Sequence, residues 1–172
     1  VHGIPSREVR LAAGDVVSLD LGIIYKKLVT DSAFTLGVGR ISPVAKKLIK
    51  KTQKALWHGI AAARAGSTVG DIGFAIEQYV KKQGLWVIRE LVGHGVGYKI
   101  HEEPNIPNYG PAKTRELLKP GMVLAIEPMV SIGNKGVVES ADGSFITRDN
   151  SLAAHFEHTI VITSKKPLIL TA

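Results

Sequence analysis

Four carboxylates lie within stretches of the sequence that otherwise read as apolar β-strands. Aspartate and glutamate are depleted in strands, and burying an unpaired carboxylate is costly. A single acid could lie on the solvent-exposed face of a strand. Four acids are better explained by a shared role, because buried charges are usually paired or bound to a metal. These residues are Asp20, Asp31, Glu127 and Glu157.

Two histidines stand in a glycine-rich segment between these acids. His94 is the second residue of GHGVG, and His101 opens HEEP. Glycines allow the backbone to approach a neighbour closely, and the two histidines are seven residues apart, unlike the i, i+4 pair of a zincin helix. We therefore expect loops or strand ends to hold them, with two exposed loop histidines as the alternative. His155 and His158 flank Glu157 and receive no role.

This combination of residue types indicates metal chemistry. Carboxylates with an imidazole suit hard or borderline divalent ions, and two such ions would neutralise the charge of the four acids. Ions held about 3.5–4 Å apart activate a water for attack on a carbonyl or phosphoryl group. The residues alone therefore predict a two-metal hydrolase and leave its substrate open.

The elements that must position these groups follow an order of strands, two helices and further strands. Residues 15–24 and 28–36 read as strands joined by a turn at Tyr25–Lys27. Capping residues and apolar periodicity predict helices over 42–66 and 68–83. This order predicts an α+β fold with helices on one face of a largely antiparallel sheet. The short apolar runs that follow are 86–92, 122–130, 136–147 and 157–163.

The composition is that of a soluble globular protein. The 172 residues are 45% hydrophobic and 22% charged, and a domain takes about 100–200 residues, so we expect one domain over 1–172. No apolar run approaches the ~20 residues that span a bilayer. The absence of cysteine excludes disulfides and thiolate ligands and fits a cytoplasmic protein. The chain opens at VHGIPS without a starting methionine, and we expect a segment of the fold to precede it.

The net charge is moderately positive, at +7. Such an excess can mark a nucleic-acid surface, but a solvated lysine-rich surface is the simpler interpretation. Much of it is concentrated on the first expected helix, without the interleaved aromatic residues of a single-strand binder. The lysines concerned are Lys46, Lys47, Lys50, Lys51 and Lys54.

The chain resembles the type I methionine aminopeptidases, peptidases of the pita-bread fold, over its whole length. The resemblance implies a curved, mostly antiparallel sheet with helices on one face, incomplete at the N-terminus, and a single metallopeptidase catalytic domain over 1–172. Five motifs in order carry it: VHGIP at 1–5, SLDLG with VTDSAFTLGVG from 18 to 39, GHGVGYKIHEEP at 93–104, KPGMVLAIEPMV at 119–130, and SLAAHFEHTIVIT at 151–163.

The family's metal ligands match the residues that were already singled out. Asp20 resembles the bidentate carboxylate on one ion. Asp31 and Glu157 resemble the carboxylates that bridge both ions. His94 and Glu127 resemble the remaining ligands of the other ion. The resemblance thus implies two divalent ions, with cobalt, manganese, iron and zinc all able to satisfy such ligands.

The resemblance also implies the reaction. A water activated between two divalent ions would attack the first peptide carbonyl. Glu127 would act as general base, His101 would steady the carbonyl oxygen, and His2 would lie near the scissile nitrogen. The substrates implied are nascent peptides that begin with methionine followed by a small residue. We expect a monomer, without DNA or membrane partners, and the lysine-rich helix makes the ribosome surface a candidate partner.

The sequence departs from the family's pattern at two places, and two alternative functions remain open. Ile100 stands where many members place a pocket phenylalanine, and residues 142–149 lack the usual tryptophan. An Xaa-Pro aminopeptidase or prolidase of the same fold is one alternative, but residues 156–159, Phe-Glu-His-Thr, resemble the methionine enzymes. A non-catalytic binding module is the other, although all five ligand positions are filled.

Overall fold

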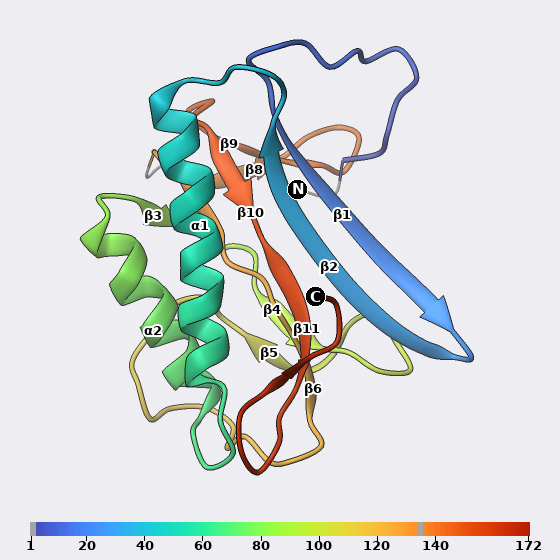
Figure 1. Cartoon of the computed structure of the whole chain (residues 1–172), viewed down its shortest axis with the longest axis vertical. Coiled ribbons are helices and arrows are strands. Elements are labelled where there is room, and N and C mark those ends of the chain that lie inside the picture. The colour runs from blue at the N-terminus through green and yellow to red at the C-terminus, as the bar shows by residue number, and fades with distance from the viewer. Residues whose placement is uncertain (1–2, 134–135) are drawn as a thin grey trace.

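The computed structural model describes residues 3–133 and 136–172 (Figure 1). The chain begins with a hairpin of β1 (Val16–Tyr25) and β2 (Leu28–Gly37). Two helices follow, α1 (Pro43–Ala62) and α2 (Val69–Lys82). The later strands are short: β3 (Trp86–Val87), β4 (Gly93–Gly95), β5 (Glu102–Ile106), β6 (Val123–Ile126), β7 (Met129–Ser131), β8 (Val137–Glu139), β9 (Phe145–Thr147), β10 (Ala153–His155), β11 (Glu157–Val161) and β12 (Leu168–Ile169).

The largest sheet brings together strands that are far apart in the sequence. Its strand order is β1-β2-β11-β6-β4-β5, with β12 paired to β11. All of its strand pairs are antiparallel. Smaller sheets of β10-β7-β3 and β8-β9 flank it. The α+β prediction is confirmed, and hairpin β1–β2 is joined to the second half of the chain through β11.

The N-terminal hairpin has almost the predicted bounds. Its strands pair in register from Val16 with Gly37 to Tyr25 with Leu28. Lys26 and Lys27 form the tight turn, and both have positive φ angles, 48° and 70°. A two-residue turn with positive φ at both positions matches the right-handed twist of the strands that it joins.

Both helices begin at side-chain caps. The hydroxyl of Ser42 accepts a hydrogen bond from the Ala45 N–H at the start of α1. Thr68 and Asp71 form a reciprocal capping box on α2. The first helix ends at Ala62, four residues before the predicted stop, and the following segment pairs with residues near Leu118 instead. Within the described chain, neither helix is long and apolar enough to cross a bilayer.

The helices pack together against one face of the large sheet (Figure 1). Leu124, Ile126 and Ile160 point from β6 and β11 into this helix-covered core, and all are fully buried. Gly59 lets α1 approach both α2 and the sheet closely, because a Cβ there would lie 2.7 Å from Ile76 Cδ1 of α2 and 3.2 Å from Ile126 Cγ2 of β6. Side chains alternate between the two faces of a strand. The residues next to these apolar ones therefore point to the opposite, open face.

Several strands were not predicted from the sequence. These are β4, β5, β10 and β12, while the expected strand over 86–92 shrinks to Trp86–Val87. β4 and β5 contain glycine, polar residues or proline, β10 consists of two alanines and a histidine, and β12 has only two residues. Weak propensity or short length leaves little local signal for these strands, and pairing with neighbouring strands defines them.

Candidate metal centre

Strand pairing places three of the predicted ligands around one small residue, Ala33. Asp20 of β1 pairs with Ala33, and on its other side Ala33 pairs with Glu157 of β11. Asp31 precedes Ala33 by two residues on β2, so it points to the same face. The three carboxylates therefore come from three adjacent strands onto the open face of the sheet.

The next strands complete this face. Ile126 of β6 pairs with His158 of β11, and both point toward the helices. Glu127 and Glu157, each one residue away, consequently point to the open face. His94 of β4 pairs with Ala125, which lies two residues from Glu127 and on its side of the sheet.

The glycines on either side of His94 are required by close strand packing. A Cβ on Gly93 would collide with the carbonyl oxygen of Ala125, and one on Gly95 would collide with the carbonyl of Glu103. The close approach predicted from GHGVG is thus made to the neighbouring strands. His94 is the central residue of β4, whereas the sequence suggested a loop or a strand end.

A backbone contact prepares His94 to bind a metal. Its Nδ1 lies 3.0 Å from the carbonyl oxygen of Gly95, an acceptor, so the proton is assigned to Nδ1. The lone pair of Nε2 then faces the carboxylates. Histidine ligands generally fix their tautomer in this way, by donating their other N–H.

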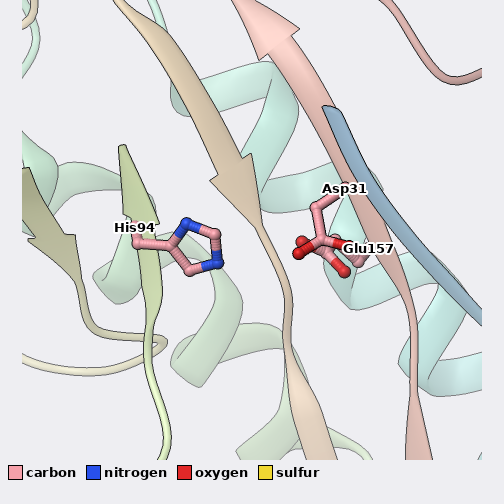
Figure 2. Close-up of side chains that lie close together, drawn as sticks. All are labelled: Asp31, His94 and Glu157. Carbon is pink, nitrogen blue, oxygen red and sulfur yellow. The ribbon is translucent and has the colours of Figure 1, made fainter. Parts of the chain in front are cut away.

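The ligand atoms converge in two groups that share Glu157. Asp31, His94 and Glu157 form one group, and Glu127, His155 and Glu157 form the other. Within each group the atoms lie within 4.8 Å of one another. Figure 2 shows His94 pointing across the strand between them toward the neighbouring carboxylates of Asp31 and Glu157. All five residues are buried.

Crowding of negative charge changes the acidity of these groups. Burial raises the pKa of Glu157 to about 10, and the charges of Glu127, Asp31 and Asp20 add to the shift. Burial and the charge of Asp20 also raise the pKa of Asp31, against the N–H of Ser32 and the proximity of His94. A cation at this position would remove the repulsion between the carboxylates.

The donor set fits a divalent metal. Oε1 of Glu157 is buried and has no hydrogen-bond partner among residues 3–133 and 136–172. Buried polar atoms are nearly always satisfied, so this oxygen is suited to a ligand from outside the chain. Carboxylate oxygens with an imidazole nitrogen bind borderline divalent ions.

The remaining predicted residues lie around the cluster. Asp20 and His101 are exposed, and they line a cavity of about 590 Å³ together with Asp31. The His101 ring packs edge-on against His94, with the ring centroids 4.4 Å apart. His101 also lines a second cavity of about 630 Å³. His2 lies outside the described residues.

The sequence did not assign His155, which the structure brings into the cluster. Its side chain is 2% exposed, and its Nε2 lies 3.2 Å from Oε2 of Glu127. One signal was present in the sequence, because His155 and Glu157 stand two residues apart and such residues share a strand face.

Comparison with known proteins identifies the family. The model of metallopeptidase family M24 matches residues 1–164, and the chain belongs to this family. Within it, the chain groups with the methionine aminopeptidases. The methionine aminopeptidase of Aquifex aeolicus is 49% identical over 174 aligned residues, which cover 99% of this chain and 67% of that protein. The crystal structure of the Thermotoga maritima methionine aminopeptidase matches with a TM-score of 0.96 and 45% identity, covering 99% of this chain and 69% of that one.

A prolidase shares the fold at lower similarity. The prolidase of Pyrococcus furiosus matches with a TM-score of 0.78 and 27% identity, covering 99% of this chain and 45% of that one. The predicted pita-bread fold is thereby confirmed. The higher identity to methionine aminopeptidases supports the main interpretation of the sequence over the Xaa-Pro alternative.

Proposed function

We propose that residues 1–172 form a catalytic domain that hydrolyses the first peptide bond of peptides beginning with methionine. Its substrates are nascent peptides with a small second residue. The buried cluster of Asp31, His94, Glu127 and Glu157 carries this proposal. Relatives named methionine aminopeptidase support it, with 40–49% identity over 99% of this chain.

The proposed centre holds two divalent ions, drawn from manganese, iron, cobalt and zinc. Glu157 converges with Asp31 and His94 in one group and with Glu127 in the other, which supports this number, as does the presence of Asp20 on the same cavity as Asp31. Calorimetric titration of the chelator-treated chain with Mn²⁺ should give two bound ions per chain. Saturation at one ion would contradict the two-ion proposal while retaining a metal centre.

The residues of the chain divide the catalytic work. Divalent ions at this site would supply Lewis acidity, which polarises a carbonyl and makes a water acidic enough to attack near neutral pH. Glu127, held beside His94 with 3.4 Å between Oε1 and Nε2, takes the proton of that water and gives it to the leaving amine. His101 donates a hydrogen bond to the carbonyl oxygen as negative charge develops there.

The two cavities that His101 lines suit the two parts of the substrate. Leu19 and Ile100 provide apolar surface in the cavity that contains Asp20 and Asp31, and we assign the methionine side chain to it. Lys99, Glu102, Glu103 and Asn105 make the other cavity polar. The peptide that follows the scissile bond would occupy this second cavity.

Release of methionine from Met-Ala-Ser tests the proposed activity. The chelator-treated chain should be inactive and should regain activity with Mn²⁺ or Co²⁺. Ala-Pro-Ser serves as the matched substrate, because an Xaa-Pro aminopeptidase would cleave it and a methionine aminopeptidase would not. Cleavage of Ala-Pro-Ser alone would favour that alternative, and cleavage of neither peptide would contradict the proposal for this chain.

The lysine-rich face of α1 is proposed to dock on ribosomal RNA, with the protein acting as a cytoplasmic monomer. Lys46, Lys47, Lys50 and Lys54 are exposed along one helix, and Lys51 is half-buried beside them. Phosphate contacts of this kind weaken steeply with salt.

Changing Lys46, Lys47, Lys50 and Lys51 to glutamate should abolish salt-sensitive co-sedimentation with ribosomes. The same change at Lys165 and Lys166, which are exposed elsewhere, is the control, and unchanged co-sedimentation of the α1 variant would contradict the proposal.

A further inference from the structure

His155 is a buried histidine with no part in the mechanism described above. It lies on β10, and it lines the same cavity as Asp20 and Asp31. Within residues 3–133 and 136–172, neither of its ring nitrogens has an aligned hydrogen-bond partner. A buried imidazole without partners costs free energy, so its retention beside the cluster requires a reason.

Two imidazoles bracket the carboxylate of Glu127. Nε2 of His94 lies 3.4 Å from Oε1, and Nε2 of His155 lies 3.2 Å from Oε2. The second distance is within reach of a hydrogen bond, although the N–H does not point directly at the oxygen. Contacts between active-site groups are often poorly aligned in the free protein and tighten in the complex.

The backbone of His155 is held firmly in place. The hydroxyl of Thr35 accepts a hydrogen bond from the His155 N–H and donates one to the His155 carbonyl, each at 2.8 Å. Because its proton is used in this way, Thr35 accepts from Ser18, whose hydroxyl oxygen lies 2.7 Å away. His155 is thereby anchored to β1 and β2, the strands that carry Asp20 and Asp31.

We propose that His155 is a positioning residue that donates its Nε2–H to Oε2 of Glu127 and so directs Oε1, beside His94, toward the metal. The inference rests on the proposed metal centre. Carboxylates that bind metals are themselves hydrogen-bonded, and loss of such partners typically costs about 10–100-fold in metal affinity. A role for His155 as a direct ligand, or as packing alone, is an outcome that the experiment distinguishes.

Amide substitutions separate these roles because they mimic different ring nitrogens. Glutamine places an amide N–H as many bonds from Cβ as Nε2, whereas asparagine reaches only the position of Nδ1. Leucine fills the space without a donor. We would measure the Kd of Mn²⁺ by calorimetry for His155→Gln, His155→Asn and His155→Leu, and the thermal unfolding of each in chelator.

The donor role predicts a specific order of affinities. His155→Gln should bind Mn²⁺ within about threefold of the parent chain, while His155→Asn and His155→Leu should bind ~10–100-fold more weakly. If all three variants bind Mn²⁺ as tightly as the parent chain, His155 serves packing alone; if His155→Gln loses as much affinity as His155→Leu, His155 is a ligand. Either result would overturn the inference. If His155→Leu does not fold, the comparison of the two amides still decides.

His158 provides the matched control on the opposite face of the sheet. Its Nδ1 lies 3.0 Å from Oγ1 of Thr171, and its ring packs near Trp57. His158→Gln and His158→Asn should leave the Mn²⁺ affinity unchanged. Absence of Mn²⁺ binding by the parent chain itself would overturn the proposed metal centre, and the inference with it, whereas normal parent binding with indifferent variants would overturn only the role of His155.

Discussion

The hydroxyl of Thr159 holds the backbone of Asp31 at both its polar groups. It accepts a hydrogen bond from the Asp31 N–H at 2.8 Å and donates one to the Asp31 carbonyl at 2.7 Å. The backbone pairing between β2 and β11 covers only Ala33 with Glu157 and Ser32 with His158. Thr159 therefore extends the connection between these strands to Asp31, a proposed ligand, at the point where backbone pairing ends.

Removal of this hydroxyl should weaken metal binding as well as the fold. Thr159→Val leaves a buried N–H and a buried carbonyl unpaired, which costs about 1–3 kcal/mol. Because Asp31 then loses its anchor, the Kd of Mn²⁺ should rise ~10-fold or more, and Thr159→Ser should restore it. Thr52→Val is the control, since the buried Thr52 hydroxyl bonds to Leu48 within α1. An unchanged Kd in Thr159→Val would limit Thr159 to a structural role.

Neutralising Asp31 or Glu157, both proposed as metal ligands, should abolish tight metal binding. Asp31→Asn and Glu157→Gln keep the shape of each side chain but remove its charge. Since loss of an outer partner already costs about 10–100-fold in affinity, loss of either ligand should exceed that range in a calorimetric titration. Glu116→Gln, at an exposed position, should leave the titration unchanged. Retained affinity in both ligand variants would argue against a centre at Glu157.

His101 should affect turnover and leave the metal in place. It is exposed, and it lies outside both groups of converging ligand atoms. His101→Ala should therefore bind Mn²⁺ like the parent chain, while kcat for Met-Ala-Ser falls ~10²–10³-fold, the usual effect of removing one oxyanion donor. His58→Ala changes an exposed histidine stacked on Tyr79 of α2 and should change neither quantity. Loss of metal from His101→Ala would make His101 a ligand.

Glu157 should make the metal-free chain less stable as the pH rises. Its pKa is raised to about 10 by burial and by the neighbouring charges, whereas an ordinary glutamate titrates near 4.5. The folded chain thus keeps a proton that the unfolded chain releases. The resulting stabilisation is complete below 4.5 and is lost progressively as the pH approaches 10. In chelator, the midpoint temperature of thermal unfolding should fall between pH 4.5 and 10 more steeply in the parent chain than in Glu157→Gln. Equal slopes would contradict a raised pKa of Glu157.

Local signals in the sequence predicted the first hairpin and both helices well. The turn at Lys26 and Lys27 separates two long runs of β-forming residues, and Ser42 and Thr68 are recognisable caps. The end of α1 was placed too late because Gly66 does have a positive φ, of 87°. It adopts this angle in the turn after the helix, where its N–H bonds to the Leu118 carbonyl.

The strands around the site could be predicted less well, because they are defined by partners that are distant in the sequence. The segments around His94 and His155 contain glycine, alanine and polar residues with little strand propensity. Pairing with Ala125 and Met129, respectively, makes them strands. The convergence of Asp31, Glu127 and Glu157 could nevertheless be expected from the sequence, because a carboxylate in an apolar strand is conspicuous wherever its neighbours lie.

Asp20 and His2 show a further limit of the sequence. Asp20 lines the cavity and its charge contributes to the raised pKa values of Asp31 and Glu157. It is exposed, however, and lies outside both converging groups. The role of Asp20 as a ligand stays a prediction. The placement of His2 near the scissile nitrogen also stays a prediction, because His2 lies outside the described residues.

Alternation along β6 and β11 has a consequence for how this sequence can change. Ile126 and Ile160 face the helices, while Glu127 and Glu157 face the open side. Insertion or deletion of one residue would exchange these sets: isoleucines would face the open side of the sheet and carboxylates would lie in the hydrophobic core. These strands should therefore not tolerate a change in length. In a library of one-residue deletions we expect no active members with a deletion in β6 or β11, whereas deletions in the exposed turn at 141–143 should be tolerated.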